Sequence, residues 1–405
     1  MSENKKLVPK RRFKAFQNTD AWEQHELGET LDDLKSGLSR KLSTDDIGLP
    51  VVRANNINDA VLNMMDDVKY WFKDDPQGAT TSNYFIRKGD ILINFINSET
   101  KMGTGAIVDD EPHRETIYTT NILRARLKPE YDIQFWFALT QTKKYKYDIK
   151  LITKPAVNQA SFTTIDYKNL KYKFPEYNEQ HKIGNFFSNL DQTIAFQQRK
   201  LEKMKSMKSA YLSEMFPAEG ERKPKRRFPG FTDDWEQCEL GELSKITIGE
   251  FVIKTKQNPN SEYPVYNGGR SHTGFYDEFN NNENKIVISA RGANAGFVNL
   301  VRRKYWAGNS CYSVSILDEN KVNLDFLFQA IKKKQNLFTD YQQAANIPSV
   351  SKKDVELFQI SLPVFEEQVK IGKLFKNLDQ TITFQQQKLE KLQNIKKAYL
   401  NEMFI

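Results

Sequence analysis

The chain contains an internal duplication, and this feature constrains its fold more than any other. The segment NLDQTIAFQQRKLEKMKSMKSAYLSEMF runs from Asn189 to Phe216 and recurs as NLDQTITFQQQKLEKLQNIKKAYLNEMF from Asn377 to Phe404. Every matching position lies at the same offset, with no insertion or deletion. A repeat this long in a chain of 405 residues indicates tandem duplication. We therefore expect two structurally related halves.

A second, shorter motif opens each half. Pro-Lys-Arg-Arg-Phe occupies residues 9–13 and recurs at 224–228, and in both places a Trp-Glu-Gln and then a Glu-Leu-Gly-Glu follow. A single basic pentapeptide would suggest an address signal or a phosphate contact. Its repetition favours a structural anchor, and phosphate contact by Arg226 and Arg227 is a secondary hypothesis. The stretches between the matching ends, about residues 30–175 and 243–363, have diverged, which predicts one shared frame that holds two different inserts.

The duplicated segments have the heptad pattern of a coiled coil. Positions spaced alternately by three and four residues continue for more than four heptads; most are apolar, two in each copy are polar, and polar residues cover the other faces. The expected seam consists of Leu190, Ile194, Gln197, Leu201, Met204 and Lys208 in the first copy, and Leu378, Ile382, Gln385, Leu389, Leu392 and Lys396 in the second.

Polar seam residues specify which register two helices adopt. An antiparallel pair could match Gln197 with Lys396 and Lys208 with Gln385 at the same time, and we predict that register. A shift by one heptad would bury a glutamine amide without a partner, which costs about 1–3 kcal/mol. The alternative is that each helix only covers the core of its own domain.

These patterns predict an α+β protein with a tandem-duplicated, pseudo-twofold architecture. Two α/β domains would be separated by two long antiparallel coiled-coil helices. The expected segments are a first domain at 1–175, which includes the frame segment 9–29; a first long helix at 176–216; a second domain at 217–363, which includes the frame segment 217–242; and a second long helix at 364–405.

Each insert combines an apolar strand, a polar loop with glycine, and a second strand. The two stretches are GDILINFINSETKMGTGAIV from Gly89 and NKIVISARGANAGFVNLV from Asn284. Arg and Asn side chains can pair with guanine and adenine edges, and Lys side chains can hold phosphates, although the same residues also form turns and solvated surface. A net charge of +8 favours a polyanionic partner. The candidate DNA contacts are Arg53, Asn55, Asn56, Asn94, Asn97, Lys101 and Thr104 in the first insert, and Tyr266, Asn267, Arg270, Arg291, Asn294 and Asn309 in the second.

Motifs for catalysis are missing from the sequence. It has no GxxxxGK[ST] phosphate loop, no GxGxxG fingerprint, no Asn/Asp-Pro-Pro-aromatic catalytic box of the methyltransferases that modify amino groups, and no paired nuclease signature. The two cysteines and four histidines lack the spacing of metal ligands. We expect neither a catalytic site nor a metal site. The sequence has no apolar run long enough for a membrane span and no apolar core of a signal peptide, so we expect a cytoplasmic protein without a membrane partner.

The whole layout resembles the specificity subunit of type I restriction–modification enzymes. The resemblance is carried by Arg12-Phe13, Trp22 and Leu27-Gly28-Glu29, by Arg227–Phe231, Trp235 and Leu240-Gly241-Glu242, and by Asn-Leu-Asp-Gln-Thr-Ile at 189–194 and 377–382. It implies that the two domains are target-recognition domains, each of which recognises one half of a split, asymmetric site in double-stranded DNA. The second insert is closer to the family pattern, with YPVYNGG at 263–269 and ISARG at 288–292, whereas the first departs from it at 94–105.

The resemblance also implies partners. They would be two modification subunits that bind S-adenosylmethionine and methylate adenine, and two restriction subunits that use ATP and Mg²⁺ to translocate and cut DNA. No cofactor is expected to bind this chain directly. The alternative interpretation is a coiled-coil adaptor with two protein-binding domains. A self-sufficient methyltransferase or nuclease is disfavoured by the missing motifs.

Overall fold

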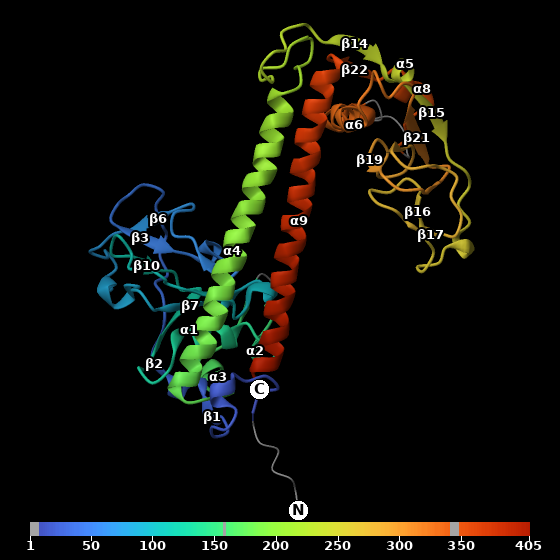
Figure 1. Cartoon of the computed structure of the whole chain (residues 1–405). Coiled ribbons are helices and arrows are strands. Elements are labelled where there is room, and N and C mark those ends of the chain that lie inside the picture. The colour runs from blue at the N-terminus through green and yellow to red at the C-terminus, as the bar shows by residue number, and fades with distance from the viewer. Residues whose placement is uncertain (1–7, 157–158, 341–347) are drawn as a thin grey trace, which may run out of the picture. The chain divides into compact units, whose positions relative to one another are not determined.

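The chain forms two compact units that share two long helices. The computed structural model describes residues 8–156, 159–340 and 348–405 (Figure 1). One unit contains Met1–Gln197 with Lys388–Ile405, and the other contains Gln198–Gln387. Helix α4 spans Tyr177–Glu214 and helix α9 spans Phe365–Met403, so each unit includes part of both. We call these the first and second unit.

In its described residues, the first unit contains two main sheets and three short α-helices. An antiparallel four-stranded sheet has the order β2-β11-β7-β9, and a three-stranded sheet has the order β10-β3-β6, in which β10 and β3 are parallel. Its strands are β1 Glu23–Glu26, β2 Leu31–Ser36, β3 Leu49–Val52, β4 Ile57–Asn58, β5 Val61–Leu62, β6 Lys69–Trp71, β7 Ile91–Asn94, β8 Ile96–Asn97, β9 Gly105–Ile107, β10 Ile117–Tyr118, β11 Ile122–Leu127, β12 Ala160–Ser161 and β13 Lys171–Phe174. Its short helices are α1 Ile133–Thr140, α2 Lys143–Ile152 and α3 Thr164–Lys168.

The second unit repeats this topology although its sequence has diverged. Its four-stranded sheet has the order β15-β21-β18-β19, and its three-stranded sheet has the order β17-β16-β20, with β16 and β20 parallel. Its strands are β14 Glu236–Glu239, β15 Ser244–Ile248, β16 Tyr263–Tyr266, β17 Gly274–Tyr276, β18 Lys285–Ser289, β19 Val298–Val301, β20 Trp306–Ala307, β21 Cys311–Ile316 and β22 Gln359–Leu362. Its short helices are α5 Leu240–Leu243, α6 Leu324–Lys333, α7 Leu337–Asp340 and α8 Lys352–Glu356.

The repeated Glu-Leu-Gly-Glu motif forms the same local structure in both units. Its second glutamate, Glu29 or Glu242, accepts a hydrogen bond from the backbone N–H of the first, at 2.9 Å in each case. This capping box ends β1 and β14 and starts a short turn of helix. Strand β1 then pairs with β13, and β14 pairs with β22, just before the long helices begin. The motif therefore joins the start of each half to its long helix.

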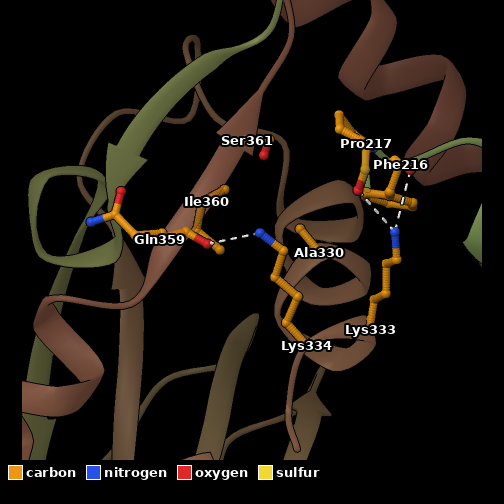
Figure 2. Close-up of a pocket in the computed structure, with 8 residues that line it drawn as sticks. All are labelled: Phe216, Pro217, Ala330, Lys333, Lys334, Gln359, Ile360 and Ser361. Carbon is orange, nitrogen blue, oxygen red and sulfur yellow. Dashed lines mark hydrogen bonds between the residues drawn. The ribbon is translucent and has the colours of Figure 1, made fainter. Parts of the chain in front are cut away.

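The end of each long helix completes the core of the other half of the duplication. In the first unit the ring of Phe404 packs against Trp22, Phe135 and Phe187, with centroids 6.3, 5.1 and 5.8 Å away. In the second unit Phe216 packs in the same way against the equivalent rings of Trp235, Phe326 and Phe375, at 5.9, 5.5 and 5.8 Å. Lys333 also donates to the carbonyl oxygens of Phe216 and Pro217 beyond the end of α4 (Figure 2). Neither unit is thus built from one half of the sequence alone.

The Pro-Lys-Arg-Arg-Phe motif anchors the frame. Its second arginine makes a buried two-pronged ion pair with a glutamate in the first turns of a long helix. Arg12 Nε and Nη2 donate to Glu179 at 2.7 and 2.6 Å, and Arg227 donates to Glu367 at 2.9 and 2.6 Å. These hydrogen bonds, chiefly, raise the pKa of Arg12 and of Arg227. The Arg227 guanidinium thus binds a buried carboxylate, which favours the structural anchor over the suggested phosphate contact.

The two long helices are antiparallel within each unit, as predicted, but the predicted register is wrong. Lys208 Nζ donates to Asp379 at 2.5 Å in the second unit, and Lys396 pairs with Asp191 in the first. Each lysine therefore binds an aspartate that lies six residues before its expected glutamine partner. Gln197 and Gln385 are buried, and the Oε1 atom of each has no hydrogen-bond partner in the described structure.

Interactions outside the seam explain this register. Lys396 also donates to Gln141, which follows α1, and Gln329 in α6 donates to Asp379 at 2.7 Å. Each Lys–Asp pair is therefore connected to the insert, through the residue that follows α1 in the first unit and through α6 in the second. A heptad pattern contains no information about these contacts.

Among the residues that the structure describes, no helix is both long enough and apolar enough to span a membrane.

Candidate nucleic-acid interface

Three loops meet in the second unit, where β16, β18 and β20 end. Asn267 Oδ1 accepts a hydrogen bond from the Ser310 backbone at 3.1 Å, which joins the loop after β16 to the loop after β20. Arg270 Nε donates to Asn294 Oδ1 at 3.2 Å, which joins the first loop to the loop after β18. Asn309 lies in the loop after β20. The structure thus brings together candidates that are spread over more than 40 residues of sequence, as counted from Asn267 to Asn309.

Arg291 has the most available side chain of this group. It is exposed, and its guanidinium makes no hydrogen bond or ion pair with the part of the chain that the structure describes. The next residue, Gly292, has a φ of 88°, a left-handed conformation that favours glycine and lets the loop turn back. Tyr266 is half-buried, and burial raises its pKa, so its hydroxyl stays protonated. Arg291 can offer a two-pronged donor to a base edge or a phosphate.

The first unit has the equivalent three loops, after β3, β7 and β10, but their side chains are paired differently. Arg53 is bound to Asp67 at 2.7 Å, whereas Asn55 and Thr104 are exposed. Lys101 Nζ donates to Asn58 Oδ1 at 3.1 Å, which connects the Gly loop to the β4–β5 hairpin. The carboxylate next to Arg53 partly neutralises this surface.

Asn56 and Asn94 are buried and hold the loops in shape. The Asn56 side chain accepts from the Arg53 backbone at 2.9 Å and donates to the Asp66 carbonyl at 2.8 Å. The Asn94 side chain donates to Thr104 Oγ1 at 3.1 Å and accepts from Asn97 Nδ2 at 3.3 Å. Sequence reasoning could not separate these structural amides from exposed ones.

Sequence reasoning also missed a basic cluster beside the second group of loops. Lys332 Nζ lies 3.7 Å from the centre of the Phe297 ring and donates to the Val298 carbonyl at 2.8 Å, and the Arg270 guanidinium lies 5.8 Å from the same ring. Burial, followed by repulsion from Lys208 and Arg270, lowers the pKa of Lys332 to about 8. Lys332–Lys334 is a run of three lysines, and its sequence does not indicate which one faces the loops.

The other two lysines of that run have structural roles. Lys333 holds the end of α4, and Lys334 Nζ donates to the Gln359 carbonyl at 3.4 Å (Figure 2). Burial lowers the pKa of both. In the described part of the chain, no three His, Cys, Asp or Glu side chains are grouped so as to hold a metal ion.

Two homologous α+β units that share long helices, each with three converging polar loops, define a protein with two recognition surfaces. The chain belongs to the type I restriction modification DNA specificity domain family, whose model matches residues 20–206 and 232–394. The resemblance seen in the sequence is thereby confirmed.

Individual relatives agree with this family. The chain is 28% identical over 396 residues to a protein of Methanocaldococcus jannaschii that is named as a candidate specificity subunit of the type I restriction enzyme MjaX. The aligned residues make up 94% of this chain and 92% of that protein. It is 26% identical over 182 residues to the MjaVIII specificity subunit of the same organism, 42% of each chain. The crystal structure of the type I restriction–modification S subunit from M. genitalium has a TM-score of 0.74 at 18% identity, over 98% of this chain and 99% of that one, and so has the same fold.

Proposed function

We propose that this chain is the DNA specificity subunit of a type I restriction–modification complex and supplies no catalysis itself. One observation carries the proposal: the two units have the same strand order and the same three loops, but different side chains at the loop ends. A shared frame with divergent surfaces suits a protein that recognises two different sequences. The family and the relatives' names support DNA as the ligand.

In this proposal each target-recognition domain, 1–175 or 217–363, recognises one half of a bipartite site. The exposed side chains Asn55, Thr104, Arg270 and Arg291 are the proposed contacts that reach DNA first. Buried Asn56 and Asn94 would act by holding their loops. The helical segments 176–216 and 364–405 would set the spacing between the half-sites.

We further propose that the long helices bind two copies of one modification subunit. Phe196 in α4 and Phe384 in α9 occupy equivalent positions of the duplication, and their side chains are 57% and 62% exposed. A single exposed phenylalanine is common on a protein surface, so it is the recurrence at the same position of both copies that supports a contact surface. Because the same residue recurs among the same neighbours, both sites would bind the same kind of subunit. Restriction subunits would join the resulting complex.

Mass measurement of the intact complex tests this stoichiometry. Phe196→Asp should remove one modification subunit and Phe384→Asp the other, because a buried charge without a partner opposes association. Ser206→Asp adds the same charge at an exposed polar position of α4 and should leave two subunits bound. Two subunits retained by both Phe variants would contradict the proposed surfaces.

An exchange of the first insert tests DNA recognition. Residues 30–175 are replaced by the first insert of another family member, and the methylated sites are mapped in a host that carries the complex. We expect a change in one half-site only. Changes in both halves would contradict independent recognition. The adaptor alternative predicts that the complex binds DNA duplexes weakly and without salt dependence, whereas DNA-binding proteins lose affinity steeply as salt rises.

A further inference from the structure

The basic cluster in the second unit joins three elements. Arg270 comes from the loop between β16 and β17, Phe297 directly precedes β19, and Lys332 lies in α6. Both cations lie against the Phe297 ring, at 5.8 and 3.7 Å from its centre. Arg270 also donates to Asn294 at 3.2 Å, so the cluster borders the loop that contains Arg291.

The positive charge of this cluster is not neutralised within the described structure. The charged groups that face Lys332 are Lys208 from α4, Arg270 from its loop and Asp379 from α9. Asp379 is already occupied, because it accepts from Lys208 at 2.5 Å and from Gln329 at 2.7 Å. Neither Arg270 nor Lys332 forms an ion pair with another described residue. An anion placed here would relieve repulsion that the protein itself leaves in place.

We propose that Arg270 and Lys332 together bind one phosphate of the DNA backbone beside the 291–296 loop. This inference rests on the proposed function. A phosphodiester offers acceptor oxygens for both kinds of donor, and contacts of this kind fix how a protein is placed on the duplex without selecting a base. The bound phosphate would position Arg291 against the adjacent base pairs.

The site is specific to the second unit. Lys332 lies nine residues after the α6 cap Asn323, and Gln141 lies nine residues after the α1 cap Asp132, so Gln141 takes the place of the lysine. Gln141 is itself bound to Lys396. Thr104, which precedes β9, takes the place of Phe297. Only the half-site bound by the second unit would therefore receive this phosphate contact.

The proposal predicts that DNA binding is linked to proton uptake. The pKa of Lys332 is lowered to about 8, so part of the free protein lacks this charge near that pH. A phosphate favours the charged form and raises that pKa, so binding near this pH is accompanied by uptake of a fraction of a proton per chain. The affinity for DNA should correspondingly fall as the pH rises from about 7 to 9.

Calorimetry with the full-length chain and a short duplex of mixed sequence measures this uptake. Titrations at pH 8 in buffers of different ionisation enthalpy give the number of protons bound. Lys332→Gln introduces the residue of the first unit; it should abolish most of the uptake and reduce the slope of log affinity against log salt by about one. Lys321→Gln is the matched control. Lys321 precedes the start of α6, and its side chain is 81% exposed. This variant should leave proton uptake unchanged.

The outcomes separate this proposal from the wider function. Unchanged proton uptake and salt slope in Lys332→Gln, with DNA still bound, would overturn the phosphate site and leave the DNA function intact. Absence of salt-dependent duplex binding by the wild-type chain would overturn both. If millimolar inorganic phosphate suppresses the proton uptake of the wild-type chain while the affinity for the duplex stays unchanged, the site binds a free anion and the assignment to DNA is wrong.

Discussion

Replacement of Arg12 by glutamine should destabilise the first unit strongly. The Arg12 side chain is 6% exposed and that of Glu179 is fully buried, so solvent does not screen the ion pair. Arg12 Nη1 also donates to the Thr19 carbonyl oxygen at 3.2 Å. Its Nη2 donates to the Thr19 hydroxyl at 2.6 Å and to the Asp20 carbonyl oxygen at 3.1 Å. Arg12→Gln leaves the buried carboxylate without its cation. Loss of one partner of a buried ion pair lowers the free energy of unfolding by about 3–5 kcal/mol.

Hydrogen exchange measured peptide by peptide is the suitable assay, because a chain with two compact units is not expected to unfold in a single step. A loss of about 3–5 kcal/mol corresponds to exchange faster by roughly two to three and a half powers of ten. The acceleration should be confined to peptides of the first unit, such as β1 and β13. Arg227→Gln should have the same effect on the second unit through Glu367.

Arg11→Gln provides the matched control. It removes the same charge from the adjacent residue, whose ion pair with Glu402 is exposed on both sides. Exposed ion pairs contribute little, so exchange in the first unit should remain close to that of the wild type. Equal effects of Arg11→Gln and Arg12→Gln would refute the view that the second arginine of the motif is the structural anchor.

Three more predictions concern the long helices and the basic cluster. Phe404→Ala should destabilise the first unit by about 3–5 kcal/mol and Phe216→Ala the second, because each ring follows the end of one long helix and fills the core of that unit. Hydrogen exchange measured for each unit separately would detect which unit each variant destabilises. Gln197→Leu and Gln385→Leu should each raise stability by about 1–3 kcal/mol, measured by thermal unfolding, because each removes a buried oxygen that lacks a hydrogen bond; lower stability would contradict the assigned register. The pKa of Lys332 is lower in the folded than in the unfolded chain, so the free energy of unfolding should rise as the pH rises from about 8 to 10. This rise should be absent in Lys332→Met when unfolding is measured across that range.

The features of the fold that follow from short-range patterns were predictable from the sequence. The heptads and their polar seam residues predict two long antiparallel helices, and the duplication predicts two related halves. The divergent inserts did not indicate that their four-stranded sheets share one strand order, because strand pairing depends on side-chain packing more than on residue identity. The helix register failed for a related reason, since Gln141 and Gln329 reach the Lys–Asp pairs from distant segments.

The candidate site was predictable in location more than in detail. Glycine and asparagine residues after apolar strands correctly indicated where loops would form. Residue type alone could not show that the Asn94 amide is buried in its own loop whereas Arg291 is exposed. Lys332 could not be found at all, because its position against Phe297 depends on how α6 packs on the four-stranded sheet.

The two units differ at the positions where a difference changes recognition without changing the frame. The Lys–Asp pair between the long helices is present in both, as Lys208–Asp379 and Lys396–Asp191. Nine residues after the helix cap the first unit has neutral Gln141, which binds Lys396, and the second has Lys332, which interacts electrostatically with Lys208 and Asp379. Since the pair fixes both helices in either case, the neighbouring residue is free to vary. A duplicated chain can therefore acquire a phosphate contact in one half only, and the two halves then hold DNA with unequal strength while they keep a common architecture.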